Sequence, residues 1–228
     1  MRIKAIFVEM LKHFVSNQNN YLKGFLLSLL IIVCCTSCFK NLTKLTVIYE
    51  NNFDDYNLKG IKIHDYYGPV SDIKIQTYNG NPVLGRFNSS GIELSLTDLP
   101  QHTAMSIEFD LYIHDIWKND LWKYSFDGAD QLLTGFSNDS TIQQSYPHWL
   151  GNGSSLYPAT SGAYTNNLPG ACILSGNPHG TSLYKIARTF LHTNSTFDFA
   201  CSDAGDYFNL PCNRSWSMDN LKITLINN

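Results

Sequence analysis

Two acidic side chains in one short stretch are the residues of this sequence best placed to do chemistry. Glu108 and Asp110 lie two positions apart in a run, Ala104 to His114, in which apolar and polar residues alternate. This alternation is typical of a β-strand with one buried and one polar face, so both carboxylates should share the polar face. Paired carboxylates can act as nucleophile and general acid on a glycosidic bond. The alternative is a pair that simply faces solvent.

The strand that carries this pair is expected to lie at the centre of a sheet. Its apolar residues, Met105, Ile107, Phe109, Leu111 and Ile113, would form the buried face. Short alternating segments separated by Gly, Pro and Asn turns continue from Leu45 to the end of the chain. This pattern predicts an all-β, antiparallel two-sheet jelly-roll sandwich. Further strands are expected at 45–50, 73–78, 92–96, 121–126, 131–136, 183–192, 196–200 and 221–226.

Composition limits the classes of partner. The chain has 228 residues, a net charge of −3 and only 16 Lys and Arg residues. It therefore lacks the basic stripe that neutralises phosphates, and nucleic acid is not an expected partner. Its length is ordinary for one all-β domain.

The N-terminal segment is typical of an exported protein. Basic residues precede an apolar run, Phe25 to Cys35, which is about half the ~20 residues that a membrane-spanning helix needs. The sequence Cys35-Thr36-Ser37-Cys38 resembles the lipobox of bacterial lipoproteins, which implies lipid attachment at Cys38. Cleavage at another Cys, or an uncut anchor, remains an alternative.

These features predict three regions. Residues 1–37 would be a helical lipoprotein signal peptide, 38–46 the lipidated Cys with a short tether, and 47–228 the sandwich. Several acyl chains on Cys38 would anchor the protein stably to a membrane. The expected location is outside the cytoplasm, at the bacterial cell surface or facing the periplasm.

Three cysteines would remain in the sandwich. Cys201 and Cys212 could close a short loop by a disulfide worth roughly 3 kcal/mol, which an oxidising compartment would permit. Cys172 would then be left over. Three reduced, buried thiols are the alternative, because an odd number of cysteines defines no pairing.

Several sequence blocks, taken in order, resemble one family. The blocks Leu84–Phe87, Phe109–Ile113 with Trp117, and Ser215–Asn220 are similar to an extracellular bacterial domain with a concanavalin A-like, or laminin-G-like, sandwich. The resemblance covers about residues 84 to 226 and implies a sandwich and an outside location more than any activity. Glycoside hydrolases of this fold place a third carboxylate on the strand of Glu108 and Asp110, and this chain has none there.

The closing strand suggests a metal site. Asp219 has the same parity as Leu221, Ile223 and Leu225, so its carboxylate is expected to point toward the core and to need a partner. In jelly-roll carbohydrate-binding modules a similar Asp joins first-strand carboxylates around a structural Ca²⁺, and the counterparts here would be Glu50 and Asp54. Oxygen ligands suit this ion. Alternatively, Asp219 caps backbone amides.

A long irregular insertion, residues 137–180, lies close to aromatic residues that could contact a ligand. Trp117, Tyr146 and Trp149 would either stack on a ligand or pack in the core. The leading hypothesis is a lipid-anchored, non-catalytic sandwich that binds glycan or another component of the cell surface, such as a surface protein. The alternatives are a glycoside hydrolase-like enzyme of concanavalin fold that uses Glu108 and Asp110, and a structural or assembly subunit of a surface complex.

Overall fold

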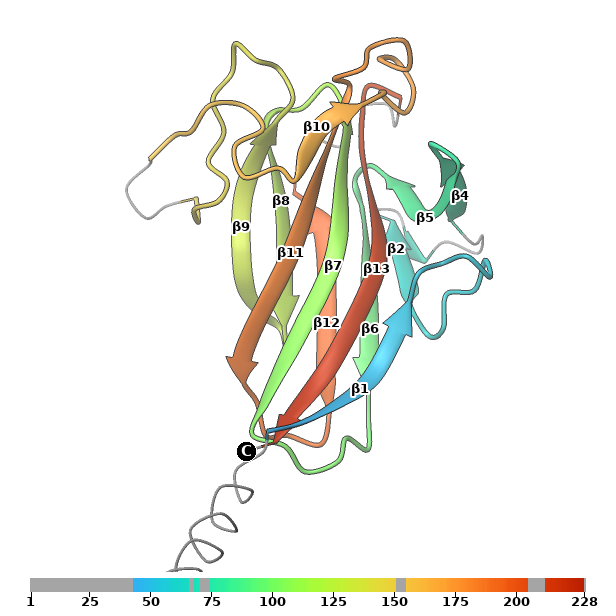
Figure 1. Cartoon of the computed structure of the whole chain (residues 1–228), viewed down its shortest axis with the longest axis vertical. Helices are drawn as coiled ribbons and strands as arrows, with labels where there is room; N and C mark the ends of the chain where they lie inside the picture. The colour runs from blue at the N-terminus through green and yellow to red at the C-terminus, as the bar shows by residue number, and fades with distance from the viewer. Residues whose placement is uncertain (1–42, 66–67, 70–73, 151–154, 205–211, 228) are drawn as a thin grey trace, which may run out of the picture. The chain divides into compact units, whose positions relative to one another are not determined.

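The computed structural model describes residues 43–65, 68–69, 74–150, 155–204 and 212–227. It confirms the predicted all-β fold, because two antiparallel sheets pack face to face (Figure 1). The predicted signal helix and Cys38 lie outside the described residues. The strands are β1 Lys44–Asn51, β2 Lys62–Asp65, β3 Gly68–Pro69, β4 Ile75–Tyr78, β5 Asn81–Phe87, β6 Ser90–Leu96, β7 Ala104–Asp115, β8 Lys118–Phe126, β9 Ala129–Ser137, β10 Thr165–Leu168, β11 Thr181–Leu191, β12 Phe197–Asp203 and β13 Arg214–Asn227.

Two layers make up the described part of the sandwich. The front sheet has the order β10-β11-β7-β13-β5-β4, and the back sheet has the order β3-β2-β6-β12-β8-β9 (Figure 1). The long strand β13 pairs with β5 along its first half and with β1 along its second half. No helix within the described residues has the length and apolarity needed to cross a bilayer.

The strand predicted to be central is central. β7 lies between β11 and β13, and its five alternating apolar residues are all at most 2% exposed. Every buried member of the hydrophobic core of the described residues lies between Tyr49 and Leu225. β1 begins at Lys44, three residues before the predicted boundary of the sandwich.

One strand that the sequence did not predict is β5. Asn79-Gly80-Asn81-Pro82 is rich in turn-forming residues, but only Asn79 and Gly80 form the turn of the β4–β5 hairpin, and Asn81 and Pro82 pair with Tyr78 and Thr77. Asn79 and Gly80 both have positive φ, 49° and 85°, which is what a tight two-residue hairpin turn requires.

The predicted irregular insertion at 137–180 contains some regular structure, namely β10 and a bridge between Gln144 and Tyr157.

A β-bulge in β13 changes which residues face the core. Asn220 has a φ of 53°, and the pairing with β7 shifts there, so that Asp219 lies opposite Asp110 and Lys222 opposite Glu108. The extra residue of a bulge reverses the alternation of side chains beyond it. The prediction that Asp219 shares a face with Leu221 is therefore wrong, and Asp219 lies on the outer face of the front sheet.

Candidate functional site

The two carboxylates of β7 do not form a catalytic pair over a hollow. Asp110 is 7% exposed and accepts hydrogen bonds from Lys185 Nζ at 2.9 Å and from Asn220 Nδ2 at 3.0 Å. Glu108 is exposed on the same face. Neither residue lines the two hollows of the surface described below. The arrangement pairs the Asp110 carboxylate with the Lys185 ammonium group on the outer face of the front sheet.

The three predicted calcium ligands do not converge. Among the described residues, no three His, Cys, Asp or Glu side chains are grouped so that they could hold a metal ion. Asp219 instead accepts hydrogen bonds from Asn81 Nδ2 and from the Asn220 backbone amide, both at 2.7 Å. Glu50 and Asp54 are exposed. Burial, together with the charge of Asp110, raises the pKa of Asp219 to about 6.

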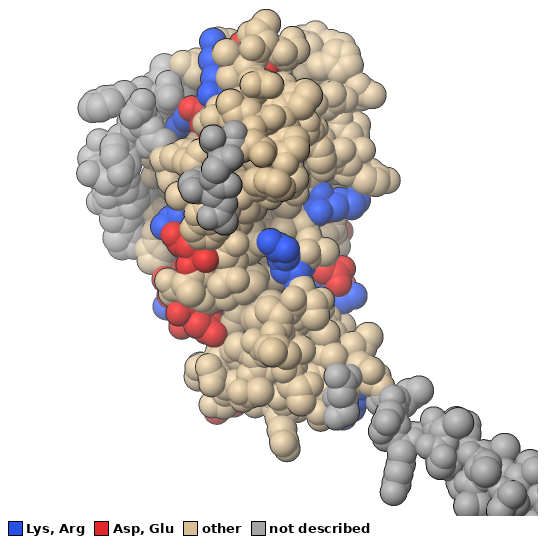
Figure 2. Space-filling model, turned by 90° about the vertical axis from the view of Figure 1, so that its left-hand side faces the viewer, with Lys and Arg blue, Asp and Glu red and all other residues tan. Residues whose placement is uncertain are grey.

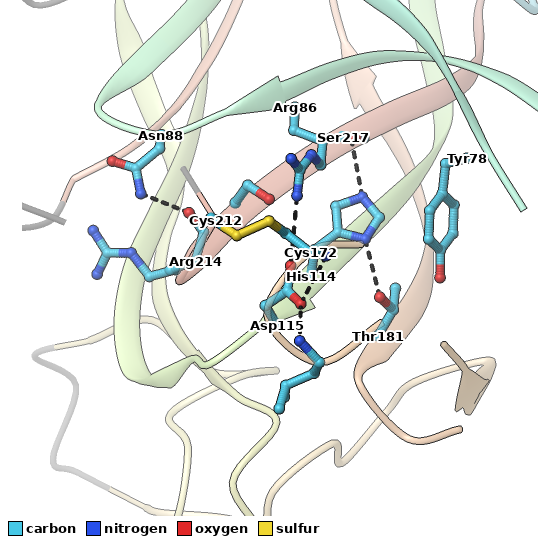
Figure 3. Close-up of polar contacts among 12 residues, drawn as sticks. Tyr78, Arg86, Asn88, His114, Asp115, Cys172, Thr181, Cys212, Arg214 and Ser217 are labelled. Atoms are coloured by element: carbon cyan, nitrogen blue, oxygen red, sulfur yellow. Dashed lines mark hydrogen bonds and ion pairs between the residues drawn. A yellow bond between two sulfur atoms is a disulfide. The ribbon is translucent and has the colours of Figure 1, made fainter. Parts of the chain in front are cut away.

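A buried polar cluster occupies the upper end of the front sheet (Figure 3). His114, on β7, is fully buried and lies 3.0 Å from the hydroxyls of both Thr181 and Ser217. Burial, aided by the positive charge of Arg86, lowers the pKa of His114 to about 3. The imidazole is therefore neutral at physiological pH, and each ring nitrogen has a hydroxyl partner.

Asp115 connects this cluster to the loop before β11. Its Oδ1 accepts hydrogen bonds from the backbone amides of Cys172 and Leu174, at 3.1 and 3.0 Å. Its Oδ2 lies 3.7 Å from Arg86 Nη1, and Asp115 is fully buried. The carboxylate thus fixes the loop over the end of the sheet, and its role is structural.

The cysteine pairing predicted from the sequence is wrong. Cys172 forms a disulfide with Cys212, which joins the loop before β11 to the start of β13 (Figure 3). Cys201 is a free thiol at an inward position of β12, 3% exposed within the hydrophobic core. Cys201 and Cys212 are near in sequence, but the strand directs Cys201 away from the surface where the loop and Cys212 meet.

The predicted ligand-binding aromatics differ in exposure. Trp117 is fully buried, with its Nε1 donating to the Ser215 carbonyl at 3.0 Å, so its assignment to a ligand surface is wrong. Tyr146 is half-buried, and its ring stacks on Phe136 at 4.7 Å between centroids. Trp149 is also half-buried. A small hollow of about 180 Å³ lies beside Tyr146, between the edges of the two sheets.

The larger hollow lies on the outer face of the back sheet and was not predicted. It has a volume of about 520 Å³ and crosses β2, β6, β12 and β8. We call it the trough. Its volume falls within the range of about 300–1,000 Å³ that is usual for ligand sites.

Small residues form the floor of the trough because of how the strands align. Gly91 lies opposite Ser202, and Ala200 lies opposite Ser125, so neighbouring central strands present small side chains on the same face. A Cβ added to Gly91 would come within 2.7 Å of the Cys201 carbonyl and 2.8 Å of the Ser202 Cβ. Glycine at this position therefore keeps the floor low and lets β6 approach β12 closely.

The walls of the trough are polar and carry both signs of charge. On one side, His64 Nε2 lies 3.1 Å from a Glu93 carboxylate oxygen. On the other side is Lys123, whose Nζ lies 3.6 Å from Asp130 Oδ1. All these side chains are partly solvent-exposed, so they can rotate toward a ligand. The trough thus offers hydrogen-bond donors and acceptors without a strong net charge.

The adjoining edge of the sandwich has a similar balance of charge. Figure 2 shows Lys and Arg side chains interspersed with Asp and Glu across the middle of this face, with a lower end that carries few charges. No extended patch of one sign is visible there, in keeping with the low content of basic residues.

The sequence carried a weak signal for the trough. Gly91, Ser125, Ala200 and Ser202 each occupy polar-face positions of alternating segments, where larger polar residues are common. The signal becomes informative only when the strand order brings the four positions together, and the order β2-β6-β12-β8 is not readable from the sequence. Exposed aromatic rings, which often mark a ligand surface, do not indicate a site that is built from small residues.

Comparison of the sequence with protein-family models and with curated proteins found no match. Solved structures with a similar sandwich include a family 35 carbohydrate-binding module from Clostridium thermocellum, at 10% identity and a TM-score of 0.35, covering 79% of this chain and 97% of the module. The CBM2 module of the evolved Dit protein of Lactobacillus casei BL23 phage J-1 matches at 10% identity and a TM-score of 0.45, covering 82% and 99%. The module CBM6cm-2 of Cellvibrio mixtus lichenase 5A, in complex with cellotriose, matches at 13% identity and a TM-score of 0.29, covering 78% and 97%. The similarity concerns the sandwich alone and says nothing about the ligand of this chain.

Proposed function

We propose that this domain is a non-catalytic module that binds a glycan in the trough of the back sheet. The observation that supports the proposal is an open hollow of about 520 Å³ with a floor of small residues and walls of mixed polar groups. A sugar carries many hydroxyls, each both a donor and an acceptor of hydrogen bonds. The imidazole, carboxylate and ammonium groups of His64, Glu93 and Lys123 complement such a ligand.

The composition of the trough also indicates the mode of binding. Its lining, within the described residues, contains no Trp, Tyr or Phe. A glycan would then be held by hydrogen bonds, many of them through water, rather than by stacking on a ring. We therefore expect modest affinity for one sugar unit and a gain in affinity with chain length, as more units contact the four strands.

We further propose that the protein acts outside the cytoplasm and is attached to a membrane by lipid at Cys38. The disulfide between Cys172 and Cys212 supports export, because such bonds form and persist in oxidising compartments. Metabolic labelling with a palmitate analogue tests the anchor. Label on the wild-type chain that disappears in Cys38→Ser is the expected result, and equal label on both proteins would contradict it.

Calcium binding by Glu50, Asp54 and Asp219 also stays a prediction. Asp219 is the one of the three that is buried, and burial would penalise its charge unless a cation or a proton compensates. Calcium would raise the thermal midpoint of the wild-type protein but not that of Asp54→Asn. An unchanged midpoint in calcium and in chelator would remove this site.

The glycan proposal can be tested on the fragment from Lys44 to Asn228, which contains all the core residues of the part of the chain that the structure describes. Affinity electrophoresis or calorimetry against a panel of neutral polysaccharides should identify at least one ligand. Ala200→Trp places a large ring on the floor of the trough and should weaken binding at least tenfold. Asp198→Trp is the matched control, because it adds the same ring on the same strand and face, outside the trough.

Two outcomes would contradict this assignment. Binding that survives Ala200→Trp unchanged would place the glycan elsewhere on the domain. Failure to bind any polysaccharide of the panel, with the fragment folded, would remove glycan binding as the function.

A further inference from the structure

A row of apolar side chains crosses the lower end of the front sheet. Leu191 lies opposite Ala104 on β7, Ala104 opposite Ile226 on β13, and Ile226 opposite Leu45 on β1. Residues paired directly across neighbouring strands point to the same face of a sheet. These four residues therefore form one continuous row over four strands, on the outer face, and we call them the apolar row.

The apolar row is unusually exposed. Leu191 is 89% exposed and Leu45 is 66% exposed, while Val47, two positions along β1 on the same face, is 48% exposed. The next positions on the other three strands are polar: Thr189, Ser106 and Thr224. Isolated exposed apolar residues are common, but a contiguous group of them usually marks an interaction site.

The position of the row in the chain indicates what covers it. Leu45 follows Lys44, the first residue of β1, and the apolar run Phe25 to Cys35 lies just upstream in the sequence. From Cys38 to Lys44 the chain advances six residues, which span about 20 Å when fully extended. Whichever way the upstream segment attaches to a membrane, this end of the sandwich stays within reach of the lipid.

We propose that the apolar row docks on the surface of a lipid bilayer, with Leu45, Val47 and Leu191 entering the interface. The inference rests on the proposed membrane attachment but not on glycan binding. Lys44, exposed beside Leu45, would lie at the level of the phosphate groups. Docking would orient the domain, so that the disulfide-linked loop at the opposite end of the front sheet faces away from the membrane (Figure 1).

Vesicle binding by the fragment from Lys44 to Asn228 tests docking separately from lipid attachment, because the fragment lacks Cys38. The fragment should co-sediment with large phosphatidylcholine vesicles. The double variant Leu45→Ser with Leu191→Ser should lower the partition coefficient at least tenfold. The control is Leu156→Ser with Ile173→Ser, which removes two apolar side chains, 47% and 52% exposed, outside the apolar row and should change partitioning less than twofold.

A fluorescent label gives a second measurement. Cys201 is buried and the other two cysteines of the fragment are paired, so a cysteine introduced by Leu191→Cys offers an accessible thiol. An environment-sensitive dye at this position should shift to the blue when vesicles are added, whereas the same dye at Ile173→Cys should not.

Three results would overturn the inference. One is the absence of partitioning by the unmodified fragment, and another is an equal loss in both double variants. The third is sedimentation equilibrium that shows the row joining two copies of the fragment, with no blue shift on vesicles. Loss of palmitate labelling at Cys38, or failure to bind glycan, would leave these vesicle results unchanged and would concern only the other two proposals.

Discussion

Polar residues on the outer faces of the two sheets differ in how far the rest of the protein covers them. At the upper end of the front sheet, His114 and Asp115 lie under the loop before β11 and have partners within the protein. On the back sheet, His64 and Lys123 stand at the rim of the trough and remain partly exposed. A polar residue on a sheet face becomes structural when a loop covers it and available to a ligand when none does.

The difference between the faces follows from side-chain size as well as from the loop. The covered face has large groups, with Tyr78 and Tyr112 packed beside His114 at 4.5 and 5.9 Å between ring centroids. The open face has Gly91 and Ala200 at the corresponding central positions. Substitutions at the covered upper end of the front sheet, around His114 and Asp115, should therefore alter stability and leave glycan binding unchanged. Substitutions of exposed side chains in the trough should alter glycan binding and leave stability unchanged.

The largest effect is expected at Asp115. Asp115→Ala would leave the partly buried Arg86 without its counter-charge and remove the acceptor for two loop amides, which should cost about 3 to 5 kcal/mol of unfolding free energy. Asp115→Asn keeps an amide acceptor and should cost less. Urea unfolding measures both, with Glu108→Ala, an exposed change on the same strand, as control. A loss below 1 kcal/mol for Asp115→Ala would show that the loop is not held by this carboxylate.

The disulfide should contribute the next largest effect. It closes a loop of 40 residues, and replacing both Cys172 and Cys212 by Ser should lower the unfolding free energy by about 2 to 4 kcal/mol. Cys201→Ser, at a buried site without a disulfide, separates the loss of the cross-link from the loss of a thiol. Glycan affinity should be unchanged in the double variant, and a parallel loss of affinity would mean that the two faces are coupled.

Alternation of apolar and polar residues made much of the fold predictable. β7 was identified because its two faces differ in character from Met105 to Ile113, and its burial depends only on local sequence and the sheet around it. β5 was missed because Asn and Gly mark a break equally well whether the chain leaves the sheet or turns into a hairpin. Only the partner strand distinguishes these two cases.

The site was less predictable because it depends on details that a pattern does not encode. One residue, Asn220, inserts a bulge and moves Asp219 from the predicted inner face to the outer face. The pairing of Cys172 with Cys212 depends on a loop that Asp115 holds in place from a distant strand. The trough depends on the order of four strands that are far apart in the chain.

Acid should destabilise the covered face through His114. Its pKa is about 3 in the folded protein and near 6.5 when unfolded, so the unfolded state binds more protons between these values and stability falls as the pH is lowered through this window. From pH 7 to pH 4 this amounts to about 3 kcal/mol. His114→Gln should flatten the dependence, whereas His148→Gln, at an exposed position, should not. Identical pH profiles for the wild type and His114→Gln would contradict the burial of a neutral imidazole.

The smallest effect should come from Asp219 and should have the opposite sign. Its pKa is raised from 3.8 to about 6, so the folded state binds more protons between these values and stability falls as the pH rises through them. Asp219→Asn removes the cost of the buried charge and should stabilise the protein by about 1 kcal/mol above pH 6, after allowance for solvent screening, and by nothing below pH 4. Thermal unfolding at pH 3.5 and pH 7 measures the difference, with exposed Asp198→Asn as control. An equal gain at both pH values would mean that the substitution acts through packing. The pair Asp110 and Asp219 on the front sheet would then carry no electrostatic cost that a ligand or cation could relieve.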